Sequence, residues 1–115
     1  MRRGKLYPKQ SYLLSERLMY TAKFATAVRT DVRKLDKQLQ RIIKEEHLTS
    51  IEGDPFKAAR LLYEFKGLWS YHFNYKGTQY RIVYEIYPEA QIVLVIMIGS
   101  RERFYEALGR RIKQV

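Results

Sequence analysis

The stretch QYRIVYEIYPEAQIVLVIMIGSRERFY, residues 79–105, decides the fold of this 115-residue chain. Between residues 80 and 87 the even-numbered positions are aromatic or aliphatic, whereas the odd-numbered positions include Arg81 and Glu85. The two sets therefore point to opposite faces of a strand. Residues 92–98 are apolar throughout, which is typical of a central strand covered on both faces. The turn Pro88–Ala90 is short enough to join the two strands as a hairpin.

The chain before this hairpin predicts a strand followed by helices. Residues 18–24 alternate between apolar and other side chains, so we expect a strand with one buried face. Thr26 and Asp36 are plausible caps for two amphipathic helices, the second running from about 37 to 50. The two helices form either an αα-hairpin laid on a sheet, which we favour, or one long bent helix.

Turn residues divide the rest of the chain. The sequence Gly53-Asp54-Pro55 predicts the end of one helix and the start of a short one over about 55–63. Residues 68–75 alternate as a strand, and the period of four that begins at Phe104 predicts a C-terminal helix. We therefore expect an α+β fold in which an N-terminal strand and a three-strand meander form a small antiparallel sheet. The αα-hairpin should cover one face, and the face with Arg81 should stay open for a ligand.

Composition limits the classes of function. The net charge of +10, from 22 basic and 12 acidic residues, predicts a polyanionic partner such as nucleic acid or an acidic protein segment. The absence of cysteine excludes disulfides and thiolate chemistry and fits a reducing, cytoplasmic compartment. Two histidines without cysteine argue against a zinc site, and we expect neither metal nor cofactor. No apolar run is long enough for a membrane span.

The length predicts one domain. Residues 1–16 are basic and irregular, so we expect a frayed or loosely docked extension, possible disorder included; the alternative is an arm that contacts phosphates. Residues 17–115 should then form a single domain.

Three arginines predict an anion-binding surface. Arg81 lies in the middle of a strand, where an unpaired guanidinium is costly to bury, and Arg101 and Arg103 follow the partner strand. Tyr105 lies four residues after Arg101 and so shares its helical face. A guanidinium and a phenol on one face can hold a phosphate and stack on a base. The alternatives are an ion pair between Arg81 and Glu85, solvated arginines, and Tyr105 as part of the core.

Three further side chains are candidates. His72 lies on the strand face opposite the aromatic residues and titrates near neutral pH, so it is either a general base or acid or an inert strand histidine. Lys66 and Lys76 lie in loops near the expected open face, where each either touches phosphate or is simply solvated.

In combination, residues 18 to about 112 resemble the RelE/ParE superfamily of type II toxin–antitoxin toxins. The resemblance rests on five segments: Ala27-Val28 with Val32-Arg33-Lys34-Leu35, Gly53-Asp54-Pro55, Phe65-Lys66-Gly67-Leu68, Tyr80-Arg81-Ile82-Val83-Tyr84, and Ile98-Gly99-Ser100-Arg101 followed by Tyr105. None of these segments is specific alone, but their order and spacing cover most of the chain.

The resemblance implies a compact α+β toxin that is neutralised by an acidic, partly disordered antitoxin. RelE-like members cleave mRNA in the ribosomal A site, where the 2′-hydroxyl attacks the adjacent phosphate. Carried over to this chain, Arg81 would stabilise the phosphorane, Arg101 would stabilise or protonate the leaving oxygen, and Tyr105 would orient the nucleotide. The fourth candidate of the catalytic set is His72, and either His72 or Lys76 would handle the proton. Lys66, Lys76 and Arg103 would bind RNA.

One departure from the family pattern leaves the activity open. Ribonuclease members carry a lysine pair on the strand before the Tyr-Arg segment, and the comparable positions here are His72 and Asn74. His72 could replace the lysine as base. Alternatively, the chain is a toxin without ribonuclease activity, like ParE-like members that act on DNA gyrase, or an inactive member that only binds its antitoxin.

Overall fold

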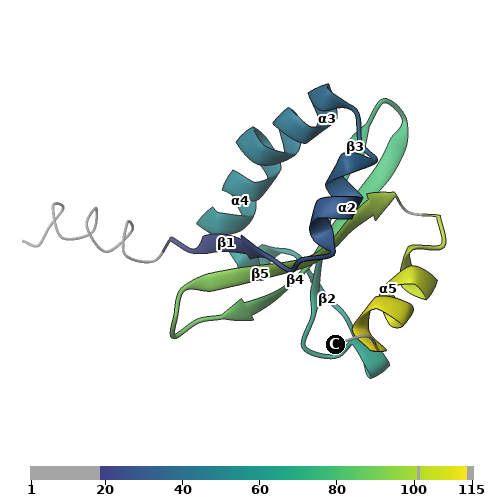
Figure 1. The fold of residues 1–115 in the computed structure, drawn as a ribbon. Helices are drawn as coiled ribbons and strands as arrows, with labels where there is room; N and C mark the ends of the chain where they lie inside the picture. The colour runs from purple at the N-terminus through teal and green to yellow at the C-terminus, as the bar shows by residue number, and fades with distance from the viewer. Residues whose placement is uncertain (1–18, 101, 114–115) are drawn as a thin grey trace, which may run out of the picture.

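The computed structural model describes residues 19–100 and 102–113, which form a five-stranded sheet with helices on both faces (Figure 1). The expected extension at residues 1–16 and the side chain of Arg101 lie outside the described residues. The elements in chain order are β1 (Thr21–Phe24), α2 (Val28–Arg33), α3 (Lys37–Ile42), the π-helical turn η1 (Ile43–His47), α4 (Leu48–Gly53), η2 (Pro55–Lys57), β2 (Ala59–Arg60), η3 (Tyr63–Phe65), β3 (Trp69–Tyr75), β4 (Thr78–Tyr87), β5 (Ile92–Ser100) and α5 (Phe104–Lys113). The α+β class expected from the sequence is confirmed.

The strands lie in the order β1-β5-β4-β3-β2. The meander β3-β4-β5 is antiparallel as predicted, and β5 is a central strand. Two details differ from the prediction. First, β1 runs parallel to β5, which is possible because a long connection with helices and three strands separates them in the chain. Second, the hairpin loop extends to Gln91, because Tyr87 pairs with Ile92.

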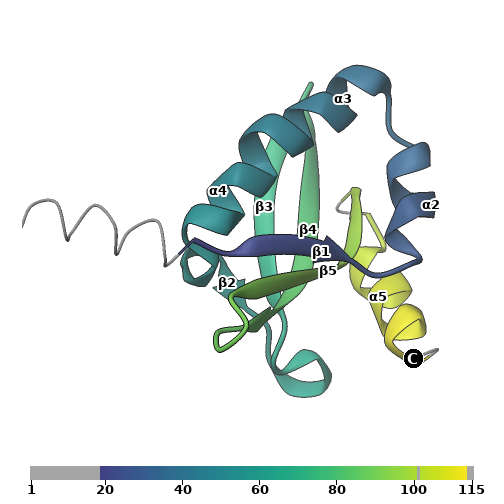
Figure 2. The ribbon, with the colours of Figure 1, turned by 60° about the vertical axis from the view of Figure 1, so that its left-hand side comes forward.

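The helical layer packs on the face of the sheet that holds Ile82 and Tyr84 (Figure 2). Asp36 caps α3 as predicted, because its Oδ1 accepts from the backbone N–H of Leu39 at 2.7 Å. The prediction that Thr26 caps α2 is wrong. The residue at the N-cap is Ala27, and no side-chain hydrogen bond caps this helix. The segments α3, η1 and α4 follow one another without a break and meet α2 at residues 34–36, so the αα-hairpin is correct and one long helix is not.

The opposite face of the sheet is not fully open, because α5 lies across part of it (Figure 1). Phe104 and Leu108 of α5 are buried against Val83 and Met97 of the sheet. An aromatic and a leucine four residues apart supply the apolar side of this helix, as the sequence predicted. The expected open face is therefore reduced to the part that α5 leaves uncovered.

The short helix expected over 55–63 is also wrong. Asp54 and Pro55 do start a helical turn, with Asp54 Oδ1 accepting from the backbone N–H of Phe56 at 3.2 Å, but η2 ends at Lys57. The two residues of β2 then pair with β3 and extend the sheet. The sequence thus predicted the start of the turn at Asp54 and Pro55 correctly, whereas pairing with β3 determined the structure of the residues that follow.

No helix in the described part of the chain is long and apolar enough to cross a membrane.

Candidate functional site

Arg81 and His72 lie side by side on the partly open face of the sheet. They are directly opposite each other in the β3–β4 register, so their side chains point to the same face. The Nε–H of Arg81 donates to Nε2 of His72 at 3.3 Å. Arg81 is half-buried and His72 is exposed, so both side chains can be reached by a ligand.

Helix α5 brings two aromatic rings to the guanidinium of Arg81. The Cζ of Arg81 lies 4.9 Å from the ring centroid of Tyr105 and 6.0 Å from that of Phe104. Gly99 is the β5 partner of Arg81, and a Cβ at Gly99 would lie 3.5 Å from the Phe104 ring. That distance is an ordinary van der Waals contact, so the first turn of α5 packs closely on β5 beside Arg81.

No carboxylate within the described residues neutralises Arg81. The expected alternative, an ion pair with Glu85, is wrong, because Glu85 instead accepts from the hydroxyl of Tyr87 at 2.9 Å. The ion pair found in the described part of the chain joins Arg111 to Asp31. The positive charge of Arg81 is thus available to an anion, and its described neighbours are the neutral acceptor His72 and the two aromatic rings of α5.

The surroundings of His72 favour its neutral form. Partial burial lowers the pKa of His72 below its usual value of 6.5, and the positive charge of Arg81 lowers it further. A neutral imidazole at neutral pH has a lone pair that can accept a proton. The geometry therefore combines a cation, a base and an aromatic ring within one small area.

Ser70 is a member of this cluster that the sequence did not single out. Its Oγ lies 3.0 Å from Nε2 of His72, and its side chain is 1% exposed. Two residues apart on β3, Ser70 and His72 point to the same face. That spacing was the only signal in the sequence, and it did not show that the hydroxyl would be buried by residues distant in the chain.

The predicted RNA-binding residues are spread more widely. Lys66 and Lys76 are exposed at opposite ends of β3, which spans about 20 Å, so they do not belong to one compact site. The Nζ of Lys76 lies 5.2 Å from the ring centroid of Tyr75. Arg103 is exposed and lines a separate hollow of about 340 Å³. Arg101, the fourth member of the predicted catalytic set, lies outside the described residues.

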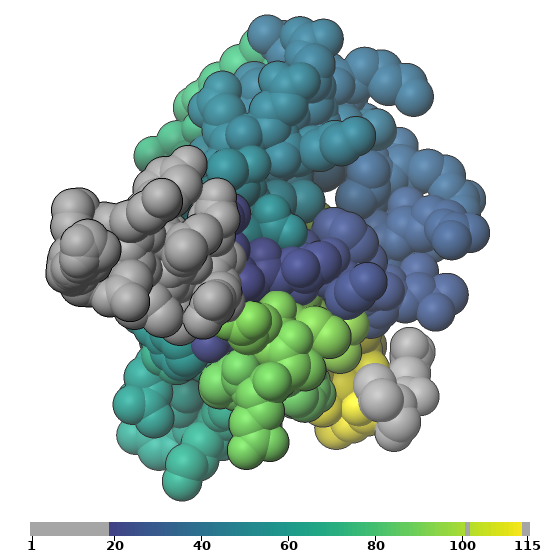
Figure 3. Space-filling model, turned by 90° about the vertical axis from the view of Figure 1, so that its left-hand side faces the viewer, coloured from purple at the N-terminus to yellow at the C-terminus, as the bar shows by residue number. Residues whose placement is uncertain are grey.

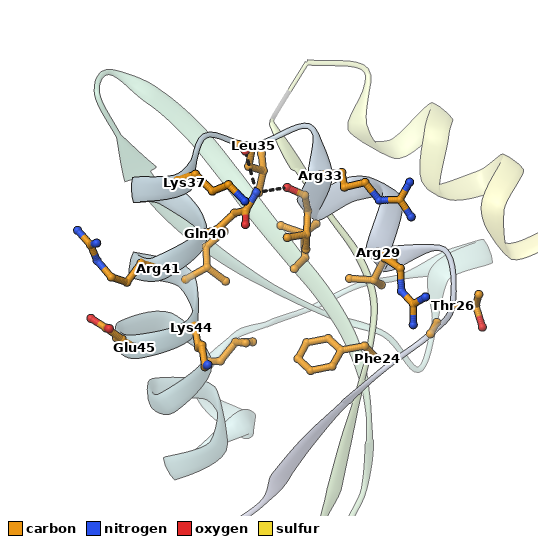
Figure 4. Close-up of a pocket in the computed structure, with 16 residues that line it drawn as sticks. Phe24, Thr26, Arg29, Arg33, Leu35, Lys37, Gln40, Arg41, Lys44 and Glu45 are labelled. Atoms are coloured by element: carbon orange, nitrogen blue, oxygen red, sulfur yellow. Dashed lines mark hydrogen bonds between the residues drawn. The ribbon is translucent and has the colours of Figure 1, made fainter.

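A second surface feature is a groove of about 1030 Å³ between α2, α3 with η1, and the end of β1 (Figure 4). Figure 3 shows the setting, with α3 and α4 along one side of β1 and β5 along the other. The floor of the groove is apolar: Phe24, Val28, Val32, Leu35, Ile43, Leu48 and Ile98. Its rim is basic: Arg29, Arg33, Lys37, Arg41 and Lys44, with Glu45 as the acidic residue.

The shape of this groove is fixed by a hydrogen-bonded glutamine at the corner between the two helices. The Nε2 of Gln40 donates to the carbonyl oxygens of Val32 and Leu35, each at 2.9 Å (Figure 4). Leu35 lies in the connection after α2, and the Val32 carbonyl oxygen also accepts from the backbone N–H of Leu35 at 3.0 Å, so Gln40 links α3 to the end of α2 and to this connection. Within the described residues, no cluster of histidine and carboxylate side chains could hold a metal ion.

Comparison with known proteins adds to these observations. A family model described as the ParE-like toxin of type II bacterial toxin–antitoxin systems matches residues 19–109. The RelBE toxin–antitoxin complex of Mycobacterium tuberculosis is similar in structure, with 27% identity and a TM-score of 0.62, covering 72% of this chain and 99% of that chain. The intact RelBE complex of E. coli gives 26% identity and a TM-score of 0.59, covering 73% and 99%.

The free E. coli RelE toxin, in a mutant form, has a TM-score of 0.66 over 84% of this chain and 98% of that chain. Its identity of 23% supports the fold alone. No curated protein matches this chain in sequence.

Proposed function

The chain belongs to the ParE-like toxins of type II bacterial toxin–antitoxin systems, and we propose that it acts as an endoribonuclease that cleaves mRNA, in association with the ribosome. One observation supports this activity above the others: Arg81, His72 and Tyr105 converge on one accessible area, with the Arg81 guanidinium 3.3 Å from His72 and 4.9 Å from the ring of Tyr105. A cation that pairs with no carboxylate among the described residues, a neutral base and a stacking surface match the needs of phosphodiester cleavage.

In the proposed reaction the ribose 2′-hydroxyl is the nucleophile. His72 accepts the 2′-hydroxyl proton, the 2′-oxygen bonds to the adjacent phosphorus, and the bond from phosphorus to the 5′-oxygen breaks. Arg81 stabilises the negative charge on the phosphorane, and Tyr105 orients the nucleotide. Arg101 stabilises or protonates the leaving oxygen. The products are a 2′,3′-cyclic phosphate and a 5′-hydroxyl, and the internal nucleophile removes the need for a metal-bound water.

Cleavage can be tested with purified protein, translating ribosomes and a defined mRNA, with cut sites read by primer extension. We expect cuts at defined codon positions, and we expect Arg81→Ala to reduce the rate by at least a hundredfold, since a preorganised charge contributes about 3 kcal/mol. Lys57→Ala removes a positive charge at an exposed position of η2 and is the matched control, with a rate within a few-fold of the wild type. Equal activity of Arg81→Ala and wild type would reject the proposed site.

We also propose that an acidic antitoxin segment neutralises this chain by binding the groove lined by α2, α3, η1 and β1. The basic rim and apolar floor suit an amphipathic segment that has acidic side chains along its edges and apolar side chains on its inner face. The toxin–antitoxin complexes to which the chain is similar show that toxins of this fold bind an antitoxin.

A second candidate activity is inhibition of DNA gyrase without catalysis. One observation favours it: β3 carries His72 and Asn74 at the positions where the ribonuclease pattern of the family has a lysine pair. A supercoiling assay separates the two activities. Blocked supercoiling by a protein that leaves ribosome-bound mRNA intact would replace the ribonuclease proposal with this one.

A further inference from the structure

The loop that joins β2 to β3, residues 61–68, carries the two most exposed large apolar side chains in the described part of the chain. Leu62 is 64% exposed and Tyr63 is 87% exposed. Figure 2 shows this loop projecting beyond the lower end of the sheet. Single exposed apolar side chains are common on protein surfaces, so the conformation and the neighbours of the loop decide what this pair does.

Backbone hydrogen bonds fix the shape of this loop. The N–H of Leu61 donates to the carbonyl oxygen of Leu68 at 2.9 Å, and the N–H of Leu68 donates to the carbonyl oxygen of Phe65 at 3.0 Å. The N–H of Lys66 donates to the carbonyl oxygen of Tyr63 at 3.0 Å. Tyr63 is therefore presented on a preformed turn, which lowers the entropic cost of binding a ligand there.

The backbone of Tyr63 is in an unfavourable conformation. Its φ of 57° lies in the left-handed region, and Tyr63 is the aromatic residue among the four described non-glycine residues with positive φ. Glycine would adopt this conformation without steric cost, whereas the exposed ring of Tyr63 gains little packing in return. Strain of this kind is concentrated at sites of binding and catalysis. The conformation and the exposure together indicate a side chain that serves a ligand rather than the fold.

Phe65 anchors the loop beside the candidate site. The ring of Phe65 lies 5.8 Å from the ring of Tyr105, whose centroid lies 4.9 Å from Cζ of Arg81. Leu61 and Phe65 also pack against the apolar cluster through which α5 contacts the sheet. Tyr63 is two residues from Phe65, so their Cα atoms are at most about 7 Å apart. A strand of RNA with one phosphate at Arg81 can thus reach the tip of the loop within a few nucleotides.

We propose that loop 61–68 is a second subsite for single-stranded RNA, where a base that flanks the cleaved phosphodiester stacks on Tyr63 and Lys66 contacts a phosphate. This subsite rests on the proposed ribonuclease function. An exposed aromatic ring and an exposed lysine on one loop suit a single strand, because every base has a π-face and every nucleotide a charge. Glu64, which is also exposed, repels phosphate, so the strand should pass on the side of Lys66. The contact of the loop with Tyr105 and the net charge of +10 favour RNA over an apolar protein surface as the occupant.

The test compares the affinity of the full-length protein for a short and a long RNA by NMR titration. Both probes have a deoxynucleotide at the reacting position and cannot be cleaved; the short probe is a dinucleotide, and the long probe extends several nucleotides to each side. Tyr63→Ala should weaken binding of the long probe at least about fivefold, as expected for the loss of one stacked base, and leave the dinucleotide unchanged. Tyr63→Phe keeps the ring and should bind both probes as the wild type does. Tyr87→Ala, at an exposed tyrosine at the end of β4, is the matched control and should change neither affinity.

Two further variants separate stacking from charge and from loss of structure. Lys66→Ala should reduce the slope of log affinity for the long probe against log salt by about 0.7, the value for one phosphate of a single strand, whereas Tyr63→Ala should keep the slope of the wild type. Tyr63→Gly relieves the positive φ, so it should keep or raise the melting temperature while weakening the long probe as Tyr63→Ala does. Weaker binding by a protein of undiminished stability excludes unfolding as the cause.

Equal affinity of Tyr63→Ala and the wild type for the long probe would overturn the proposal. If that variant then lost binding to DNA gyrase, the loop would be a surface for protein contact. Cleavage of mRNA by the wild type with unchanged binding in Tyr63→Ala would reject the subsite and keep the ribonuclease function. Weaker binding of the long probe alone, in a protein that cleaves no RNA, would reject the ribonuclease function and keep the assignment of Tyr63 to RNA.

Discussion

The candidate site depends on three side chains that the register of the sheet and one helix bring together. Arg81 and Tyr105 were predicted from their place on a strand and at the start of a helix, and His72 from its strand face. The sequence could not show that His72 and Arg81 would be cross-strand partners, because register depends on a two-residue turn at Lys76–Gly77 in which both residues have positive φ. It could not show the buried Ser70 at all.

The pKa of His72 provides a prediction at this scale. Burial, and then the charge of Arg81, lowers the pKa in the folded protein below 6.5. The folded state therefore binds fewer protons than the unfolded state just below pH 6.5, and this site contributes stability that is lost as the pH falls through that window. NMR titration should give a midpoint below 6.5 in the wild type. Arg81→Gln should raise it without restoring 6.5, because burial remains, whereas Lys76→Gln should leave it unchanged. A lower midpoint in Arg81→Gln would contradict this assignment.

At the scale of elements, one buried carboxylate adds a polar link to the apolar contacts that hold α5 on the sheet. Asp31 of α2 is 7% exposed and accepts from Arg111 of α5 at 2.6 and 2.9 Å and from the backbone N–H of Ile98 at 3.0 Å. Arg111 also donates to the carbonyl oxygen of Ile96 at 3.1 Å. The ion pair therefore connects α2, on one face of the sheet, with α5 on the other. The sequence predicted the apolar side of α5 but gave no signal that Arg111 would pair with a carboxylate 80 residues earlier in the chain.

Replacing Arg111 tests how far the site depends on this link. Arg111→Ala leaves the buried Asp31 carboxylate without its cation, so we expect a loss of about 2–3 kcal/mol in the free energy of unfolding, measured in urea. Arg110→Ala, at an exposed position one residue earlier, should cost less than about 0.5 kcal/mol. The Arg111 variant should also cleave RNA more slowly, because α5 positions Tyr105. Equal stability of the two variants would show that the ion pair does not hold α5 in place.

Some elements were predictable and others were not, for physical reasons. Asp36 caps α3 because its side chain reaches a free N–H, whereas Thr26, an equally good residue for the role, lies one position before the observed cap. Local signals of this kind fix turns and helix starts. The strand β2 and the parallel pairing of β1 depend on partners far along the chain, so no local pattern indicates them.

At the scale of the whole molecule, the net charge of +10 is used on two separate surfaces. One surface is the candidate site around Arg81. The other is the basic rim of the groove between the αα-hairpin and β1. Composition predicted the kinds of partner, namely nucleic acid and an acidic segment. It could not assign them to different faces, because that requires the fold.

Charge reversal on the groove should separate the two surfaces. The double variant Arg29→Glu with Arg33→Glu places acidic side chains on the rim contributed by α2. We expect affinity for an acidic antitoxin peptide to fall at least tenfold in isothermal titration calorimetry, with a weaker dependence on salt. RNA cleavage should be retained. Lys113→Glu, at an exposed position on α5, is the control and should bind as the wild type does. Unchanged peptide affinity in the double variant would place the antitoxin elsewhere.

The most direct test of the central claim is an NMR titration with a short RNA that cannot be cleaved because the 2′-hydroxyl at the reacting nucleotide is absent. If one phosphodiester binds where the three side chains converge, then the ring signals of His72 and Tyr105 and the Nε signal of Arg81 should shift together with a single dissociation constant. His47, which bonds to the Tyr71 hydroxyl on the opposite face, should stay unperturbed. Shifts confined to the groove residues, or no shift at Arg81 in the presence of saturating RNA, would contradict the account.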